Sequence, residues 1–490
     1  MAIVAVVVSL IPAYGRDAAA SPESAEHIGD AVSPINLANA IVLTLKNSPQ
    51  LAAFSWEVRA AEARQVQARL RPNPELTVEA EDVRFGRGPG THTTLRTLNW
   101  SANGLSAQTG RESESGARSG FSEAQFTVSL SQVIELGGKR AKRMILAARD
   151  RDVTAWDYEV ARADVLKGVS QAFVEVLVGQ QRVTLDDELV QLAEQVVQTV
   201  SARVSAGRVS PLEATKAETA LAVARVQANR SRRELESVRA KLAVFWGSKE
   251  RRFERVDGDL DTARGIPAWD ELVQRSSKNP DLARWRAELE KRQTAVSAQK
   301  AAAIPDLTVS AGFRMTGMPQ SDVRGSGVGL DGFSYSRGNN RSDANWDNSV
   351  VVGFSIPLPV FNRNQGSIQE AEHLLTKASE ERRATDVQVH ATLVESYQSL
   401  SSAFTTITAL KESILPAATQ TFASINEAYR QGRFGYLDVL DAQRTLFDAR
   451  QQYLDALASY HKTVAEIERT IGGSVWDAED TPKPRPEEKK

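Results

Sequence analysis

The chain has 490 residues, with 60 Lys and Arg against 62 Asp and Glu, so its formal net charge is -2 at pH 7. This near-balance gives no support to binding through bulk charge, and we expect no nucleic-acid partner. The lack of cysteine excludes disulfides, thiolate zinc sites, cysteine nucleophiles and a lipid on an N-terminal cysteine. Charged residues reach 25%, which predicts long solvated helices rather than one thick core.

An apolar run opens the chain at residues 2–13 and is too short to cross a membrane as a helix. Small residues follow it, so residues 1–20 resemble a secretory signal peptide. No Lys or Arg precedes the run, which is consistent with a start further upstream; a disordered or buried N-terminus is the alternative. No later stretch is apolar enough for a membrane helix, whereas short alternating strands stay possible.

The sequence repeats itself once. The residues Pro49, Leu51, Pro74, Leu76 and Val78 recur in order as Pro280, Leu282, Pro305, Leu307 and Val309. A period this long is typical of a duplicated half-molecule rather than a solenoid. We place the repeats at 33–247 and 267–472, with a linker at 248–266 and a polar tail at 473–490 that we expect to be disordered. Each half reads as helix, strand, long loop, strand, very long helix, tight turn and helix.

Four strands are predicted, near 75–85, 123–134, 306–316 and 348–358, because apolar and polar residues alternate there. Each run is about 10 residues, the length that a tilted strand needs to cross a bilayer. Four strands cannot close a barrel, so copies of the chain must complete it. The segments between them, 86–120 and 317–348, are expected to be long external loops. A soluble antiparallel sheet with one wet face is the alternative.

Two very long helices are predicted at 141–205 and 367–431, each spanning about 97 Å. Pro416 should kink the second helix or mark a local irregularity. Apolar residues recur at helical spacing, which predicts narrow coiled-coil seams. The seams are Leu393, Tyr397, Leu400, Phe404, Ile407, Leu410 and Ile414, and then Leu440, Phe447, Leu454 and His461. We expect His461 to be packed or hydrogen-bonded rather than a ligand.

Tight turns reverse these helices at 206–211 and 432–436, where glycine supplies the left-handed cap. Each tip combines a cation with an apolar residue, so the tips are candidate docking points as well as turns. The docking candidates are Gly207, Arg208, Val209, Ser210, Gly432, Arg433, Phe434 and Gly435. Asp438 and Asp441 follow on one helical face and would form rings of like charge in an oligomer. A solvated helix face is the plainer interpretation of these two carboxylates.

Chemical motifs are sparse. Glu370 and His373 have the Glu-x-x-His spacing of di-metal bundles, but no second copy exists to face them. The glycines of 327–332 match Gly-x-Gly-x-x-Gly without the strand and helix of a nucleotide site. We therefore predict no catalytic residue, no cofactor and no metal site, and not an enzyme.

The stretch 428–443, with its tip glycine followed by Leu-Asp-Val-Leu-Asp-Ala-Gln, resembles the TolC-type outer-membrane factor family. The resemblance covers about 35–472. It implies a mainly α chain with a membrane β-barrel, in which a homotrimer shares 12 strands above a coiled-coil periplasmic tunnel. It also implies a periplasmic adaptor and an inner-membrane RND pump as partners. The periplasmic gate would include Asp438 and Asp441, with Tyr429 and Glu213 as a tether pair.

Two further stretches, 132–140 and 356–366, resemble the branch that serves cobalt–zinc–cadmium efflux pumps. The resemblance implies a passive outer-membrane duct for divalent cobalt, zinc, cadmium or nickel. Drug efflux and type I secretion are alternatives within the same class. A soluble coiled-coil scaffold and a metal-dependent helical-bundle enzyme are alternatives of other classes.

Overall fold

The computed structural model describes residues 34–85, 90–101, 104–114, 124–249, 253–317, 328–329, 332–336 and 346–476. The expected signal peptide, 1–20, lies outside these ranges. The chain divides into two compact units. The hairpin unit comprises Met1–Gln50, Arg162–Leu272 and Leu393–Lys490, and the sheet unit comprises Leu51–Ala161 and Val273–Thr392. Each unit takes segments from both predicted repeats, so the duplication stays a prediction about the sequence.

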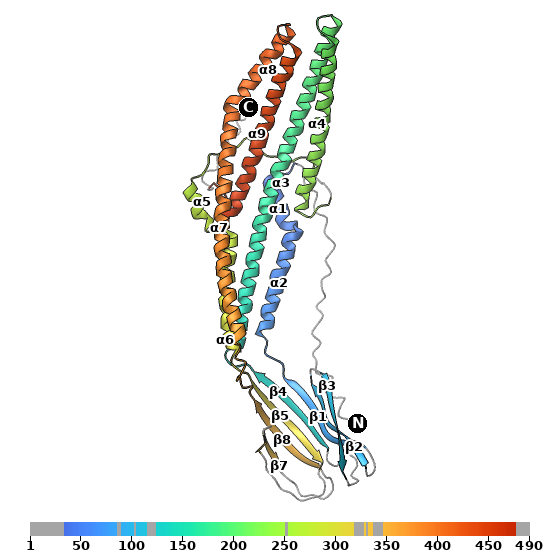
Figure 1. The fold of residues 1–490 in the computed structure, drawn as a ribbon, viewed down its shortest axis with the longest axis vertical. Coiled ribbons are helices and arrows are strands. Elements are labelled where there is room, and N and C mark those ends of the chain that lie inside the picture. The colour runs from blue at the N-terminus through green and yellow to red at the C-terminus, as the bar shows by residue number, and fades with distance from the viewer. Residues whose placement is uncertain are drawn as a thin grey trace, which may run out of the picture. The chain divides into compact units, whose positions relative to one another are not determined.

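The sheet unit contains one antiparallel sheet with the strand order β3-β2-β1-β4-β5-β8-β7-β6 (Figure 1). Its central strands are β1 (Glu75–Phe85), β4 (Gln125–Ile134), β5 (Leu307–Gly317) and β8 (Trp346–Ser355). They lie where period-two alternation predicts strands. Each is paired along nearly its whole length with its neighbour, for example from Gln125↔Thr316 to Ile134↔Leu307 between β4 and β5. None of the described helices is both long enough and apolar enough to cross a membrane.

The prediction of four strands separated by long loops was wrong for the described residues. The first loop contains β2 (Gly90–Ser101) and β3 (Gly104–Glu114), and the second contains β6 (Val328–Gly329) and β7 (Gly332–Ser336). Glycine, serine and threonine interrupt the alternation of apolar and polar residues in these segments, so the sequence does not indicate strands there. Strands that follow one another closely in the sequence can still pair, because closing a short loop costs little entropy. As a result, β2 covers the edge of β1 from Val78 to Phe85, and β7 covers β8 from Ser349 to Val352.

Helices α2 (Pro49–Arg69) and α6 (Pro280–Ala302) complete the sheet unit, with the first parts of α3 (Lys139–Ser205) and α7 (Gln365–Ala409). The first turn of α3 is basic, although the helix dipole favours anions there. The reason is that these cations bind the last carbonyls of α2. Arg140 Nε donates to Arg69 O at 2.7 Å, and Arg143 donates to Ala68 O and Leu70 O at 3.2 and 3.0 Å. The start of α3 therefore caps the end of α2.

The hairpin unit is built from α1 (Leu37–Asn47), the rest of α3, α4 (Pro211–Val244), the rest of α7, α8 (Leu415–Arg430) and α9 (Tyr436–Ile471); α5 (Trp269–Ser276) begins at its boundary. A π-helical turn, Leu410–Ile414, separates α7 from α8. There the Leu415 N–H donates to Leu410 O, five residues back, directly before Pro416. The irregularity predicted at Pro416 is confirmed, and it interrupts the long helix predicted over 367–431.

Ion pairs fix the antiparallel register of α3 against α9. Asp164–Arg469, Glu175–Lys462 and Glu188–Arg450 each lie at 2.8 Å, with Lys167–Glu466 and Arg182–Asp455 between them. Half-exposed pairs of this kind contribute little stability each, but a one-residue slip would break all of them.

The seam predicted on α9 is one residue out of phase. The buried positions are Val439, Leu446, Tyr460 and Ile467, whereas Leu440, Phe447, Leu454 and His461 are half-buried. The helix α9 is packed on more than one side, so its apolar stripe is broad. The seven-residue spacing of apolar residues therefore does not identify which residues lie at the centre of the stripe. The prediction for His461 is confirmed: its Nε2 lies 2.9 Å from Leu260 O.

Two predicted irregular segments are packed. Within the linker predicted at 248–266, the Arg264 N–H donates to Tyr460 Oη and the Tyr460 hydroxyl donates to Arg264 O, both at 2.8 Å. In the predicted tail, Val475 is buried and Trp476 lies under the Arg264 guanidinium. Disorder from 473 was therefore wrong for Val475 and Trp476. The Val475 N–H donates to Glu468 Oε1 on α9, and Trp476 Nε1 donates to Gly265 O in the linker, both at 3.3 Å. Residues 477–490 lie outside the described residues.

The turn between β4 and α3 offers a matched test of packing. Gly137 and Gly138 both have a left-handed backbone, with φ of 66° and 69°. A Cβ on Gly137 would lie 2.7 Å from Ile304 Cδ1 and 2.9 Å from Ile304 Cβ, whereas a Cβ on Gly138 would meet nothing within 4 Å. We expect Gly137→Ala to cost about 1–3 kcal/mol more than Gly138→Ala. Thermal unfolding of both variants in detergent measures the difference, and equal midpoints would contradict the assigned clash.

Candidate functional sites on the sheet and at the hairpin tips

The central strands expose their apolar face. Val128, Leu130 and Phe354 are 47%, 52% and 71% exposed, and Phe313 and Val350 are exposed as well. These residues adjoin across the sheet, since Val128 pairs with Phe313 and Phe313 pairs with Val350. They form a continuous apolar surface that crosses β4, β5 and β8. A soluble sheet normally buries such a face against a core.

The opposite face of the same strands is polar and better covered. Thr127 is buried, and Ser129, Ser310 and Arg314 are half-buried. Arg314 Nε donates to Thr127 Oγ1 at 3.2 Å, and Ser310 Oγ donates to Gly353 O at 3.4 Å. The sheet is therefore inverted relative to a soluble one, because its apolar face is the more exposed and its polar face is the better covered.

The first hairpin tip joins α3 to α4. Gly207 has φ of 69°, and the Arg208 N–H donates to Arg203 O at 2.9 Å, which closes the end of α3. Ser210 caps α4 by accepting from the Leu212 N–H at 3.3 Å, and Pro211 follows as its first residue. Gly207, Arg208 and Ser210 are exposed, while Val209 is half-buried.

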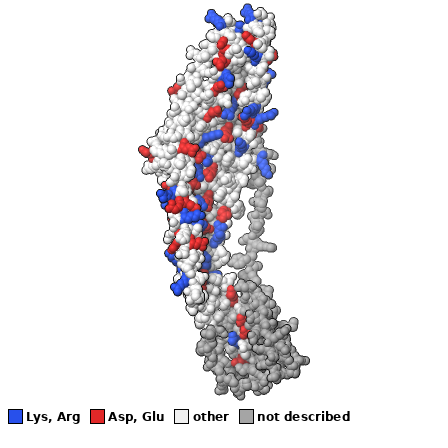
Figure 2. All heavy atoms as spheres, viewed as in Figure 1, with Lys and Arg blue, Asp and Glu red and all other residues white. Residues whose placement is uncertain are grey.

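The second tip joins α8 to α9 by the same geometry. Gly432 has φ of 78°, and the Arg433 N–H donates to Ala428 O at 2.9 Å. Gly432, Arg433, Phe434 and Gly435 are all exposed. Figure 2 shows Lys and Arg side chains at these hairpin ends and both signs of charge interleaved along the helices. The predicted docking residues are thus accessible, with Val209 partly so.

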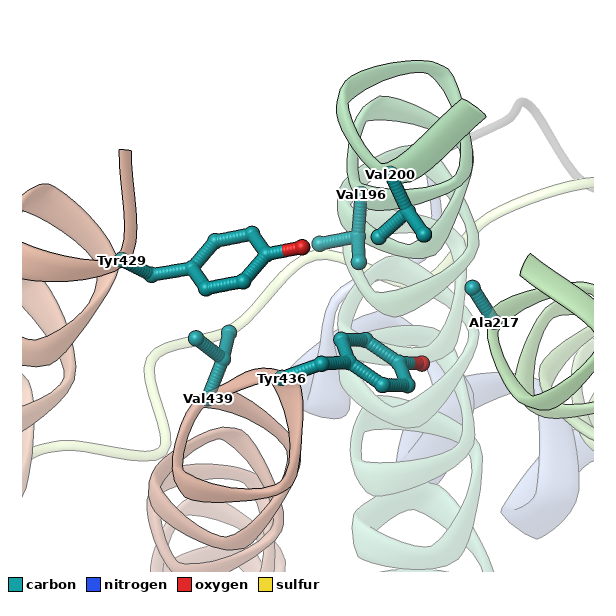
Figure 3. Close-up of a cluster of buried hydrophobic side chains, with 6 residues drawn as sticks. All are labelled: Val196, Val200, Ala217, Tyr429, Tyr436 and Val439. Atoms are coloured by element: carbon teal, nitrogen blue, oxygen red, sulfur yellow. The ribbon is translucent and has the colours of Figure 1, made fainter. Parts of the chain in front are cut away.

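Behind the tips, the four hairpin helices meet in an apolar cluster. Val196 and Val200 come from α3, Ala217 from α4, Tyr429 from α8, and Tyr436 and Val439 from α9. Figure 3 shows both tyrosine rings pointing toward α3 and α4. Both tyrosines are 2% exposed, so the cluster holds the two hairpins of this unit together at their ends.

Arg203 adds a polar link between the hairpins. Its Nη1 donates to Tyr429 O at 2.8 Å, and its Cζ lies 4.5 Å from the centroid of the Tyr429 ring. The guanidinium therefore binds both the backbone and the ring face of the last turn of α8. The sequence does not single out Arg203, because its partner lies more than 200 residues away along the chain.

Three oxygens beside this cluster are buried without a hydrogen-bond partner among the described residues: Glu213 Oε2, Tyr429 Oη and Tyr436 Oη. Burial raises the pKa of Tyr436 to about 12, and the nearby Tyr429 and Glu213 add to the shift. Burial also raises the pKa of Tyr429, although the Arg203 charge opposes this. Unpaired buried polar groups cost about 1–3 kcal/mol each, so they partly offset the apolar packing.

The structure brings Glu213 and Tyr429, the predicted tether pair, to one cluster within the hairpin unit. Glu213 lies in the first turn of α4, and its charge acts on both tyrosines. Tyr436 was not among the residues predicted for this site. An aromatic residue at the first position of α9, directly after the tip, could have indicated it. No three His, Asp, Glu or Cys side chains gather as a metal-binding group within the described ranges.

Asp438 and Asp441 are both exposed on α9. Asp438 also caps the start of α9, because its Oδ2 accepts a hydrogen bond from the Gly435 N–H at 2.9 Å. Asp441 has no such bond to the tip. The two carboxylates predicted to form rings therefore differ, and Asp441 is the cleaner probe of a charge ring.

A sheet with an exposed apolar face, in a chain that also forms two long helical hairpins, is typical of an outer-membrane channel protein. Residues 40–248 and 272–473 match the family described as "Outer membrane efflux protein", and the chain belongs to this family. Its location in the outer membrane, expected from the resemblance, is thereby confirmed.

The relatives agree with this assignment. The chain is 31% identical over 465 residues to the cobalt-zinc-cadmium resistance protein CzcC of Cupriavidus metallidurans, covering 95% of this chain and 93% of CzcC. It is 23% identical to the pyoverdine export outer membrane protein OpmQ of Pseudomonas aeruginosa, covering 89% and 84% of the two chains. The crystal structure of the outer membrane protein VceC from Vibrio cholerae shares the fold, with a TM-score of 0.64 at 16% identity over 90% and 97% of the chains.

Tyr436 provides a test of the tip cluster. Its raised pKa means that the folded state favours the neutral phenol, so this stability is complete below pH 10 and is lost as pH rises toward about 12. We expect Tyr436→Phe to be at least as stable as the parent at pH 7, by up to about 1–3 kcal/mol, and less sensitive to alkali, because the removed hydroxyl is buried without a partner among the described residues. Tyr436→Ala should lose about 3 kcal/mol or more. Chemical unfolding at neutral and alkaline pH measures this; an unchanged alkaline loss in Tyr436→Phe would rule out the assigned cause.

Proposed function

We propose that this protein is the outer-membrane exit duct of a tripartite efflux system for divalent heavy-metal cations of the cobalt, zinc, cadmium and nickel type. A periplasmic adaptor would couple it to an inner-membrane RND pump. The observation that carries the proposal is the inverted sheet, since only a lipid surrounding suits its exposed apolar face and only an aqueous lumen suits its polar face. The duct would be passive and perform no chemistry.

We infer that three copies pool β1, β4, β5 and β8 into one 12-stranded barrel, because open edges are costly in hydrocarbon. Neighbouring copies must then pair between the outer edges of β1 and β8. Among the described residues, part of each edge has no partner strand: the pairing with β2 begins at Val78, and the pairing with β7 ends at Val352. Pairing between copies would therefore begin at Glu75–Thr77 of one copy and Gly353–Ser355 of the next. As it extended along the two strands, it would displace β2 from the rest of β1 and β7 from the rest of β8.

The tip cluster is the proposed gate. Tyr429, Tyr436 and Arg203 hold the second hairpin against the first, and opening would separate α8 and α9 from α3 and α4. The three buried oxygens would gain water on opening, which lowers the free energy of the open state. In a trimer, Asp438 and Asp441 would form acidic rings that attract cations at the entrance.

The cargo assignment is supported by the similarity to a cobalt-zinc-cadmium resistance protein over nearly the whole chain. Export of an organic compound is the second candidate, because the similarity extends to a pyoverdine exporter at lower identity. A soluble coiled-coil scaffold is disfavoured by the exposed apolar sheet. A metal-dependent enzyme has no supporting group of ligands among the described residues.

The tips are tested by adding bulk without a packing clash. Gly207 and Gly432 both have positive φ, and a Cβ meets nothing closer than Arg203 Nη2 at 3.7 Å. We expect Gly207→Trp with Gly432→Trp to abolish export while trimers still form in the outer membrane, because the adaptor contact is blocked. Gly138→Trp is the control, since it has φ of 69° and open space away from the tips. Export that persists with both tips changed would refute docking there.

Cargo is tested in a strain that lacks this gene. We expect the deletion to lower the tolerated concentration of cobalt, zinc, cadmium or nickel, and a plasmid copy to restore it. Growth is compared with that in a detergent and in a dye. Sensitivity to the detergent or dye alone would show that the duct serves organic compounds instead.

A further inference from the structure

The segment that links β8 to α7 is the most exposed apolar stretch among the described residues. Residues 356–361 read Ile-Pro-Leu-Pro-Val-Phe, and Leu358 and Phe361 are 80% and 91% exposed. Ile356 and Val360 are also exposed. Burying large apolar side chains is worth about 1.5–3 kcal/mol each, so a surface of this kind calls for a covering partner.

The segment is held in shape by its own sequence and by α6. Pro357 and Pro359 fix their own φ and favour extended residues before them. Asn364, at φ of 59°, donates from Nδ2 to Gln299 O and Gln299 Oε1 at 2.8 and 2.9 Å, which ties the end of the segment to α6. Its apolar side chains are thus presented by an ordered backbone.

The exposed side chains continue the apolar face of the sheet. Val350, Val352 and Phe354 alternate along β8, and Ile356 and Leu358 keep the same period beyond the last ladder pair, Thr308↔Ser355. The Val360 N–H then donates to Leu358 O at 2.8 Å, so the chain turns at Pro359. From Val350 to Leu358 an extended chain spans about 26 Å, which at the tilt of membrane strands is roughly 20 Å of height, most of the apolar band of outer-membrane barrels.

Polar groups begin directly after this row. Phe361 is followed by Asn362 and the exposed cation Arg363, whose Nε donates to Pro359 O at 3.3 Å. An aromatic ring followed by a cation suits the boundary between acyl chains and anionic headgroups. The corresponding turn after β4 differs, because the Leu136 N–H and Lys139 both bind Asp306, at 3.0 and 2.8 Å, and Leu136 is only 36% exposed.

We propose that residues 356–361 are a membrane-interface contact, in which Leu358, Val360 and Phe361 enter the headgroup boundary of the bilayer and Arg363 meets lipid phosphates. This inference rests on the proposed function, since it extends the lipid-facing side of the sheet. The segment would set the depth at which each copy sits in the membrane. We assign the segment to lipid rather than to a second copy of the chain, because its exposed apolar side chains continue the apolar face of β8.

The cysteine-free chain allows a direct test. Single variants Phe354→Cys, Leu358→Cys, Phe361→Cys and Val387→Cys carry an environment-sensitive fluorophore in full-length protein. The protein is placed in bilayers of phosphatidylethanolamine and phosphatidylglycerol that contain brominated phosphatidylcholine. Val387 is the control, because it is 64% exposed on α7 and about 33 Å along the helix from its start.

We expect loss of fluorescence at 354, 358 and 361 and none at 387. Loss at 354 alone would overturn the interface contact while leaving the proposed duct intact. Disulfide-linked dimers through Phe361→Cys without quenching there would assign the segment to a second copy instead. No quenching at 354 would refute the lipid-facing sheet itself, and with it the proposed function.

Discussion

The exposed apolar face of the sheet is the constraint on which the rest of the sheet unit depends. Eight large apolar side chains on β4, β5 and β8 are between 38% and 71% exposed: Val128, Leu130, Ile134, Phe313, Met315, Val350, Val352 and Phe354. Transferring these side chains from water to an apolar environment would lower the free energy by of order 10 kcal/mol, which is comparable to the whole stability of a typical domain. The exposed apolar face and the apolar segment after β8 are consistent with a lipid surrounding, whereas the polar face of the same strands suits water.

The hairpin unit is stabilised by different interactions from those of the sheet unit. Its helices are held in register by half-exposed ion pairs, each of small value, and at the tips by the cluster around Tyr429 and Tyr436. Apolar packing and the Arg203 contact favour the packed arrangement of the tips, whereas three buried oxygens without a partner among the described residues oppose it. Such opposing terms would suit the gate proposed above, which a partner would have to shift.

Sequence reasoning succeeded where a pattern is local and repeated, and failed where partners are distant. The central strands lie where alternation is clean, as in Leu307 to Arg314, and the tips lie where a left-handed glycine precedes a helix start. The strands β2 and β3 were missed because apolar and polar residues do not alternate regularly along them, as in Leu95, Leu98 and Trp100 of β2. The burial phase of α9 was missed because it depends on packing on several sides of the helix. The packing of Trp476 was missed because its partners, Arg264 and Gly265, lie more than 200 residues away along the chain.

The sequence by itself determined the alternating strands, the long helices, the glycine tips and the family to which the chain belongs, since each is written in residues close together or in a fixed order. Only the tertiary structure decided that Arg203 and Tyr436 join the hairpins and which face of the sheet is covered. Contacts between residues hundreds of positions apart depend on how elements pack, and neither periodicity nor composition encodes that distance.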